Sequence, residues 1–322
     1  MRLVTRADFD GIVCGSLITL MEDIDSYLFV EPKFMQDGMV EIRQGDIIAN
    51  LPYHPDCSLW FDHHVTNKDW HFNTPIVPGK GGFRLAPSAA RVVYEYYTTE
   101  GGRQKAAEGY RQQAIGNRRI QEGLKILNSE RMRILLEDTD RIDAGRLVSE
   151  DVHHPEGYVL ISMTLDGKRI EDESYWLRLI DLLRDGSLEK VLNDPEVKQR
   201  CQGILNAQET LKEILLNRVS LKGNVIFLDL RGITDMPDGN RFLLYTLFPT
   251  GNISIKVADD SQRPNTTAIS VGYNIFNTTS KVNVGALMEK HGGGGHKVVG
   301  SCRVPSSEAE KAIREIFEAI KE

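Results

Sequence analysis

Cysteine is scarce in this sequence, and its copies are far apart. The four cysteines are Cys14, Cys57, Cys201 and Cys302. They include no Cys-x-x-Cys pair, so neither a disulfide framework nor a zinc ribbon is predicted. Long apolar runs are also absent, since no stretch approaches the roughly 18 apolar residues of a membrane span. Charged residues near the amino terminus, such as Arg2 and Asp8, interrupt any signal-peptide core. We therefore expect a cytoplasmic protein without a membrane partner.

Basic residues are in the minority. There are 39 Lys and Arg against 46 Asp and Glu, a net charge of −7. The chain therefore lacks the basic surface with which proteins hold long duplex DNA, although a local groove for a short single strand is compatible with this charge. Charged residues make up 26% and hydrophobic residues 41% of the chain, as in soluble globular proteins. A length of 322 residues favours two domains over one.

Alternating strand and helix patterns predict an α/β protein with a mostly parallel sheet. In the first part, these patterns lie at 3–4, 12–24, 26–30, 46–51, 57–61 and 88–96. The stretches 103–150 and 170–220 are expected to be largely helical. A second, smaller α/β unit follows, with patterns at 225–228, 253–257, 268–271, 284–290, 298–304 and 306–321. We predict a first domain at 1–190, a helical linker at 191–221 and a second domain at 222–322.

The segment Leu59-Trp60-Phe61-Asp62-His63-His64 is a short apolar run that ends in an acid and two imidazoles. The polar part is expected just beyond the carboxyl end of a buried strand, where open α/β sheets bind ligands. Carboxylate and imidazole together suit manganese, iron, cobalt or zinc. The alternative is a strand end with three solvated polar residues.

Two further acids follow the first predicted strand, in Asp8-Phe9-Asp10-Gly11. Carboxylates two residues apart at such a turn can point into one cleft and hold a metal. The competing interpretation is a helix cap, because Asp accepts hydrogen bonds from the free amides of a helix start. A third dense set of acids ends the stretch 131–143. Such acids are usually a solvated helix end, but one of them could complete a metal site.

Four glycines in a row precede His296, at Gly292 to Gly295. Ordering them is costly, because glycine loses more conformational freedom on folding than any other residue. A flexible loop is one interpretation. Their place between a predicted helix and a predicted strand favours the other, a nest of backbone N–H groups that approaches an anion closely.

These three motifs, in this order, resemble the DHH/DHHA1 phosphoesterase superfamily over nearly the whole chain. The nearest patterns are those of exopolyphosphatase-related proteins and of oligoribonuclease- and pAp-phosphatase-like proteins. The resemblance implies a parallel-sheet DHH domain and a smaller α/β DHHA1 domain that binds substrate. It also implies a phosphoric ester hydrolase that depends on a divalent metal.

The resemblance assigns roles to individual residues. It implies two divalent ions, Mn²⁺ or Mg²⁺, held by Asp8, Asp10, Asp46, His63 and Asp140, with Asp138 as the alternative to Asp140. It implies catalytic roles for Asp62, His63 and His64, with Asp62 orienting its neighbours and His64 facing the substrate phosphate. The substrate-binding residues would be Gly293, Gly294, Gly295 and His296.

Two positions depart from the family pattern. Val4 stands four residues before Asp8, where many members have a histidine. One metal site therefore lacks a nitrogen ligand and is expected to be weak, completed by water or empty. Gly272 stands in a strand where oligoribonuclease-like members place an arginine. Specificity for pAp or short RNA therefore stays open, and the sequence does not show whether Arg263 substitutes.

The function predicted from the sequence is hydrolysis of a phosphomonoester or phosphodiester by metal-activated water. Nucleotides, short single-stranded oligonucleotides and polyphosphate are the candidate substrates, and a homodimer is compatible with the pattern. One alternative is a nucleotide- or anion-binding protein of the same fold with little turnover. Another is a haloacid-dehalogenase-type phosphatase with Asp8 as nucleophile, although Ile12 stands where those enzymes usually have threonine.

Overall fold

The computed structural model describes residues 1–64, 81–99, 114–233, 236–237, 239–240, 242–260 and 263–321. Its contacts divide the chain into two units. The first comprises Met1–Leu147 and Glu156–Cys201, and the second comprises Val148–Pro155 and Gln202–Glu322. The long helix α11 (Pro195–Arg218) crosses this division and covers much of the segment predicted as a linker.

The first unit is built on a five-stranded sheet in the order β2-β1-β3-β4-β5. All neighbours in it are parallel, as predicted. The strands are β1 (Arg2–Thr5), β2 (Ser26–Phe29), β3 (Ile47–Ala49), β4 (Leu59–Asp62) and β5 (Gly81–Phe83). Because all run the same way, their carboxyl ends share one edge of the sheet, and the loops beyond that edge can combine into a single site.

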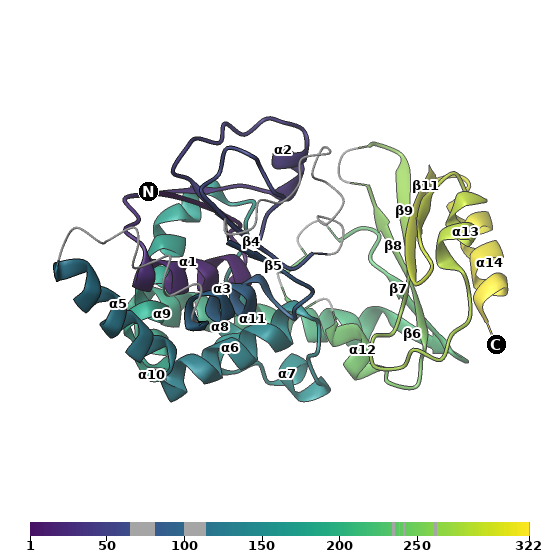
Figure 1. Cartoon of the computed structure of the whole chain (residues 1–322). Coiled ribbons are helices and arrows are strands. Elements are labelled where there is room, and N and C mark those ends of the chain that lie inside the picture. The colour runs from purple at the N-terminus through teal and green to yellow at the C-terminus, as the bar shows by residue number, and fades with distance from the viewer. Residues whose placement is uncertain are drawn as a thin grey trace. The chain divides into compact units, whose positions relative to one another are not determined.

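Helix α1 (Phe9–Met21) forms the centre of this unit, and every one of its residues is buried. Helices α3 (Ala89–Thr98), α5 (Ala114–Leu127), α6 (Glu130–Asp143) and α9 (Glu173–Asp185) pack around it. Figure 1 shows these helices gathered on one side of the sheet. The packing is close, because a Cβ on Gly15 would lie 2.7 Å from a side-chain carbon of Ile180. The unit is completed by α2 (Pro32–Gln36), α8 (Gly157–Ser162), a short 3₁₀ turn (Ile170–Asp172) and α10 (Leu188–Leu192).

A separate apolar cluster includes Val4, Ile48 and Trp60, one residue from each of three neighbouring strands. Met35 of α2 packs against it. Alternation along a strand places successive side chains on opposite faces, so these residues share one face. Val4 is fully buried in this cluster.

The second unit holds a six-stranded sheet in the order β10-β11-β9-β8-β7-β6. Only the β7–β8 pair is parallel among its described strands. The strands are β6 (Val219–Lys222), β7 (Val225–Asp229), β8 (Ile253–Asp259), β9 (Thr266–Tyr273), β10 (Gly294–His296) and β11 (Val299–Pro305). The mixed sheet confirms the prediction of a second α/β unit.

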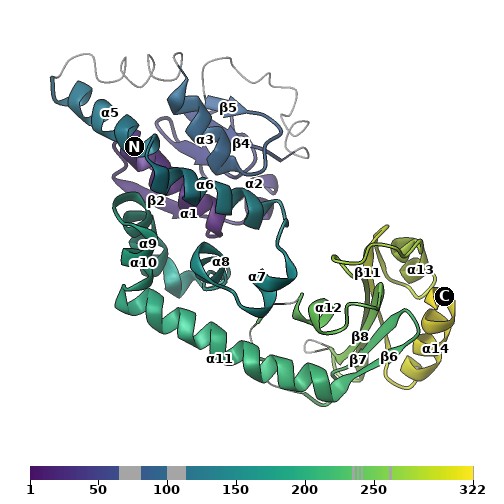
Figure 2. The same cartoon turned by 90° about the horizontal axis from the view of Figure 1, so that it is seen from below.

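Both faces of this second sheet are covered. Val225 packs with residues of α13 (Val284–Glu289) and α14 (Ala309–Ile320). The next residue, Ile226, packs with residues of α7 (Ser149–His153), α11 and α12 (Leu243–Leu247). Figure 2 shows α14 and α12 on opposite sides of the strands. Across the described parts of both units, no helix combines the length and apolar character needed to cross a membrane.

Candidate metal centre

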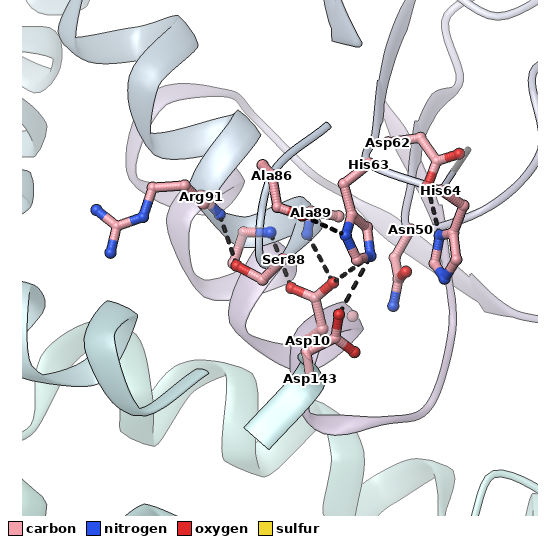
Figure 3. Close-up of polar contacts among 12 residues, drawn as sticks. Asp10, Asn50, Asp62, His63, His64, Ala86, Ser88, Ala89, Arg91 and Asp143 are labelled. Carbon is pink, nitrogen blue, oxygen red and sulfur yellow. Dashed lines mark hydrogen bonds and ion pairs between the residues drawn. The ribbon is translucent and has the colours of Figure 1, made fainter. Parts of the chain in front are cut away.

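Polar side chains gather at the carboxyl edge of the parallel sheet. Asp10 follows β1, Asn50 follows β3, and Asp62 ends β4, with His63 and His64 directly after it. Figure 3 shows these residues together with Asp143, which comes from the last turn of α6. The local pattern of an apolar strand followed by polar residues thus repeats on three neighbouring strands and converges here.

Asp10 is the most enclosed of the acids, with 2% of its surface exposed. Its two carboxylate oxygens accept hydrogen bonds at 2.8 Å from the backbone N–H groups of Ala89 and Ala90, in the first turn of α3. A helix start stabilises a negative charge in this way. Burial nevertheless raises the pKa of Asp10 well above its ordinary value, and the nearby Asp143 and Asp8 carboxylates raise it further. The site therefore concentrates negative charge that a cation would relieve.

His63 is held in the tautomer that a metal ligand needs. Its Nδ1 lies 3.0 Å from the carbonyl oxygen of Ala86, so Nδ1 carries the proton and donates it. Its buried Nε2 makes no hydrogen bond to any residue that the structure describes. Nε2 lies 3.2 Å from a carboxylate oxygen of Asp143 and 3.7 Å from one of Asp10. A nitrogen lone pair facing two carboxylates is repulsive unless a cation sits among them, so these three residues fit a divalent metal.

Asp62 and His64 form a second pair in the same place. Asp62 is buried, and its carboxylate accepts a 2.9 Å hydrogen bond from Nδ1 of His64. This bond raises the pKa of His64 above its ordinary value, against the opposing effect of burial. His64 is 40% exposed. Because Nδ1 is occupied, Nε2 is the nitrogen through which His64 can meet a substrate.

Asp8 caps helix α1, as the helix-cap interpretation predicts. Its Oδ1 accepts hydrogen bonds at 2.9 Å from the backbone N–H of Gly11 and from the side-chain amide of Asn50. Its Oδ2 lies 2.8 Å from the guanidinium of Arg6. Both carboxylate oxygens of Asp8 are therefore engaged by groups of the protein.

Asp46, predicted as a bridging metal ligand, lies away from this cluster. It precedes β3, so it sits at the amino edge of a parallel sheet whose carboxyl edge carries Asp10 and Asp62. There it forms a 2.6 Å ion pair with Arg2. This position contradicts the prediction, and Asn50 at the other end of the same strand is the residue that reaches the site.

Asp140, the predicted ligand from the acidic stretch, is also committed elsewhere. It accepts a 2.7 Å hydrogen bond from the Ser88 hydroxyl and forms a 2.7 Å ion pair with Arg91, which ties α6 to α3. The alternative, Asp138, pairs with Arg141. The acid that lies beside His63 is Asp143. The residues named from the sequence, Asp140 and Asp138, are therefore paired with arginines, and the acid beside His63 lies three positions beyond Asp140.

A cavity of about 360 Å³ opens beside the cluster. Its lining residues are His63, Leu85, Ala86, Pro87, Asp143, Ala144 and Arg146. Arg146 was not anticipated from the sequence. Its backbone N–H bonds to the carbonyl of Arg141 at the end of α6, which fixes it near Asp143. Its guanidinium forms no ion pair with a described residue, so it is available to an anion.

The end of the glycine segment in the second unit, Gly294–His296, is an edge strand and not a flexible loop. Gly294–His296 pairs with β11 as an antiparallel ladder. A Cβ on Gly293 would lie 2.1 Å from the carbonyl oxygen of Ser301, and one on Gly295 would lie 2.3 Å from that of Val299. Close packing of backbone therefore explains two of the glycines without a ligand. The substrate-binding role of Gly293, Gly294, Gly295 and His296 stays a prediction.

Comparison with solved structures finds chains that match over nearly the whole length of this one. A pGpG-specific phosphodiesterase from Vibrio cholerae is 31% identical over 98% of this chain and 97% of that chain, with a TM-score of 0.81. RecJ from Thermus thermophilus, in complex with Mn²⁺, is 15% identical over 98% of this chain and 51% of that one, with a TM-score of 0.51. An exopolyphosphatase-related protein from Bacteroides fragilis is 12% identical, covers 98% and 91%, and has a TM-score of 0.46. No protein-family model and no curated protein matches the chain.

Proposed function

Because the chain belongs to the DHH/DHHA1 phosphoesterase superfamily, we propose that it is a metal-dependent phosphodiesterase that cleaves short linear oligonucleotides of the pGpG type. The observation that carries this proposal is the match to a pGpG-specific phosphodiesterase at 31% identity over nearly both chains. The cluster of Asp10, His63 and Asp143 supports it with a set of groups suited to one divalent ion. Family membership replaces the haloacid-dehalogenase alternative.

Charge supports a substrate that brings phosphates to a cationic centre. Four carboxylates, those of Asp8, Asp10, Asp62 and Asp143, surround the site and would repel an anion on their own. A divalent ion held by Asp10, His63 and Asp143 would supply an acidified water as nucleophile and would neutralise charge on the phosphoryl oxygens.

His64 is proposed as the proton donor to the leaving oxygen. Hydrolysis of pGpG adds water across the bond between phosphorus and the 3′ oxygen, and the products are two molecules of GMP. The 3′ oxygen needs a proton as this bond breaks. Asp62 orients His64 and raises its pKa, which favours the protonated imidazole that would donate this proton through Nε2.

Arg146 and the wall of the cavity are proposed to position the rest of the substrate. A guanidinium that forms no ion pair with the residues the structure describes suits a phosphate oxygen pair, which it can meet with two parallel hydrogen bonds. The run Leu85-Ala86-Pro87 gives the cavity an apolar wall, and Leu85 is 68% exposed. That surface offers a base an apolar contact beside the reacting phosphate.

The test is a hydrolysis screen on the full chain with Mn²⁺ added. The substrates are pGpG, the same dinucleotide without its 5′ phosphate, pAp, cyclic di-GMP and polyphosphate, with products separated by chromatography. We expect pGpG to be cleaved fastest and GMP to be the product. The His63→Ala variant serves as the control for a contaminating nuclease. Equal cleavage by wild type and His63→Ala, or no cleavage of any dinucleotide, would contradict the proposal.

A second candidate is a nucleotide-binding protein of this fold that has lost turnover. The neutral Asn50 near the cluster and the Arg6–Asp8 ion pair favour it, because both reduce the negative charge available for metals. Calorimetry with pGpG separates the two candidates. Tight binding without GMP release, at any Mn²⁺ or Mg²⁺ concentration, would support the binding protein over the enzyme.

A further inference from the structure

We propose that this centre holds a single divalent ion, at Asp10, His63 and Asp143. Arg6 and Asn50 bind the carboxylate of Asp8 at the positions where a second ion would bind it. The family resemblance implies two ions. The inference rests on the proposed metal dependence, and the experiment below separates the failure of one from the failure of the other.

The coordination capacity of Asp8 is largely used. A carboxylate oxygen offers about two lone-pair directions, and Oδ1 of Asp8 already accepts from Gly11 and Asn50 at 2.9 Å each. Oδ2 lies 2.8 Å from the Arg6 guanidinium, a fixed positive charge. A metal ion at Asp8 would therefore have to share Oδ2 with this positively charged arginine or displace it.

Arg6 is held in place from a second direction as well. Its other terminal nitrogen lies 3.5 Å from a carboxylate oxygen of Glu31, which leads into helix α2. Its Nε is buried and makes no hydrogen bond within the described residues. Guanidinium groups stay charged at all ordinary pH values, so Asp8 carries a permanent counter-charge that no metal needs to provide.

Asn50 places a neutral amide beside Asp8, where an acid would be needed to bridge two metal ions. It adopts a left-handed backbone with φ of 57°, and its backbone N–H bonds to the carbonyl of Phe61. It is 2% exposed. Its amide nitrogen must face Asp8, because the flipped amide would set two oxygens against each other. Its Oδ1 is left buried without a hydrogen bond to any described residue, so the side chain adds a dipole to the site but no charge.

The charges of the remaining groups balance with one ion. The ligand atoms of Asp10, His63 and Asp143 lie within 4.8 Å of one another, and so do those of Asp62, His63 and His64. The two groups share His63, which has one nitrogen left for a metal because its Nδ1 is bonded to Ala86. The carboxylates of Asp10 and Asp143 match the charge of one divalent ion, while Asp8 is paired with Arg6 and Asp62 with His64. Every other acid considered for a second site has its own arginine, because Asp46 pairs with Arg2 and Asp140 pairs with Arg91.

The nitrogen ligand that the family pattern places beside Asp8 is missing. The residue at that position is Val4, whose side chain is fully buried in an apolar cluster with Ile48 and Trp60. The imidazole of His64 is bonded through Nδ1 to Asp62, and its Nε2 is the nitrogen assigned above to the substrate. His63 has one nitrogen committed to Ala86 and the other directed at Asp10 and Asp143.

The experiment measures metal stoichiometry on the metal-stripped full chain. Mn²⁺ is titrated by calorimetry, bound metal is counted by elemental analysis after gel filtration, and electron paramagnetic resonance distinguishes an isolated Mn²⁺ from an exchange-coupled pair. We expect one ion per chain and an isolated-ion spectrum. Two ions with a coupled spectrum would overturn this inference and leave the proposed phosphodiesterase intact. No bound ion would overturn the metal dependence itself.

Variants test which residues exclude the second ion. In Arg6→Ala/Asn50→Asp, Asp8 loses its counter-charge and gains a second carboxylate beside it, so we expect stoichiometry to rise toward two ions with a coupled spectrum. Aspartate tolerates the left-handed backbone at position 50, so Asn50→Asp alone provides a second, milder variant with Arg6 retained. Arg43→Ala, which removes an exposed arginine paired with Glu41, is the matched control and stays at one ion.

Thermal melts establish that each variant is folded before its metals are counted. A folded Arg6→Ala/Asn50→Asp protein that still binds one ion would show that these two residues do not exclude the second. If only Asn50→Asp folds, a rise above one ion in that protein supports the inference, and a value of one opposes it.

Discussion

Asp140 and Asp143 lie three residues apart on helix α6, and substitution of each by alanine should have opposite consequences. Asp140 accepts hydrogen bonds from the Ser88 hydroxyl at 2.7 Å and from two nitrogens of Arg91 at 3.0 and 2.7 Å. Asp140→Ala therefore leaves a mostly buried guanidinium without its partner. Asp143 lies beside the His63 nitrogen, and the nearby Asp10 and Asp8 carboxylates carry the same charge, so Asp143→Ala removes charge from a crowded acidic cluster.

The magnitude for Asp140→Ala follows from its exposure. Charge-assisted hydrogen bonds contribute about 1.5–3 kcal/mol each when buried, but the Asp140 and Arg91 side chains are 15% and 21% exposed. Water therefore compensates part of the loss, and the net cost is about 2–3 kcal/mol. In a domain of this size that lowers the melting temperature by roughly 4–12 °C. Asp143→Ala should leave the metal-free protein as stable as wild type, because its carboxylate and that of Asp10 repel each other.

Melting temperature with and without Mn²⁺ is the assay, because a ligand that binds only the folded state stabilises it. At 100 times the dissociation constant this amounts to about 2.7 kcal/mol. We expect wild type and Asp140→Ala to gain stability with Mn²⁺ and to lose it with a chelator, and we expect Asp143→Ala to show neither change. If Asp140→Ala were the variant that lost the Mn²⁺ response while remaining as stable as wild type, the assignment of the ligand would be refuted.

Three further predictions test other parts of the structure. Arg146→Ala should raise KM for a 5′-phosphorylated dinucleotide about 10- to 100-fold, the equivalent of one charge-assisted contact. The effect on the unphosphorylated dinucleotide should be smaller. Equal effects on both would show that Arg146 does not bind the phosphate. Burial raises the pKa of Glu22, so its contribution to stability is lost as pH rises through that pKa. Glu22→Gln should therefore raise the melting temperature more at pH 8 than at pH 4, while the exposed Glu213→Gln shows no such trend. Gly81→Ala should unfold the first unit or lower its free energy of unfolding by several kcal/mol. The reason is that φ of Gly81 is 105° and a Cβ there would lie 2.0 Å from a carbonyl oxygen of β4. A circular-dichroism melt close to that of wild type would show that β5 can move.

The layout of the first unit was predictable because the residue pattern marks where its strands end. In the run Leu59 to His64, apolar residues stop where polar ones begin, and the same switch precedes Asp10. Parallel strands bring such switches to one edge, so the meeting of Asp10 with His63 follows from local sequence and topology together.

Asp46 and Asn50 show a limit of the family resemblance. The resemblance assigns Asp46 to a metal, but Asp46 precedes the strand Ile47–Ala49, whereas Asn50 follows that strand. The strand pattern predicted at 46–51 contains both residues, so the sequence did not separate them. The end of β3 at Ala49 places Asn50 at the carboxyl edge of the sheet.

Asp140 and Asp143 show a different limit. Residues three apart on a helix share a face, so periodicity could not separate them. The two acids differ in their partners, because Arg91, which lies 49 residues before Asp140 in the chain, forms an ion pair with Asp140. Long-range ion pairs of this kind leave no local trace in the sequence. The same holds for the carbonyl of Ala86 that fixes the tautomer of His63.

Helix α1 has no solvent face. Its amino end presents Asp10 to the metal centre, and its middle is clamped where Gly15 meets Ile180 of α9. A volume change where Gly15 meets Ile180 would therefore shift the helix that carries Asp10, because close-packed interiors transmit strain. Substitutions around α1 that change thermal stability would therefore also change the turnover rate. Substitutions selected for a tighter core around α1 should reset the catalytic rate, and directed evolution for speed should draw on positions far from any substrate.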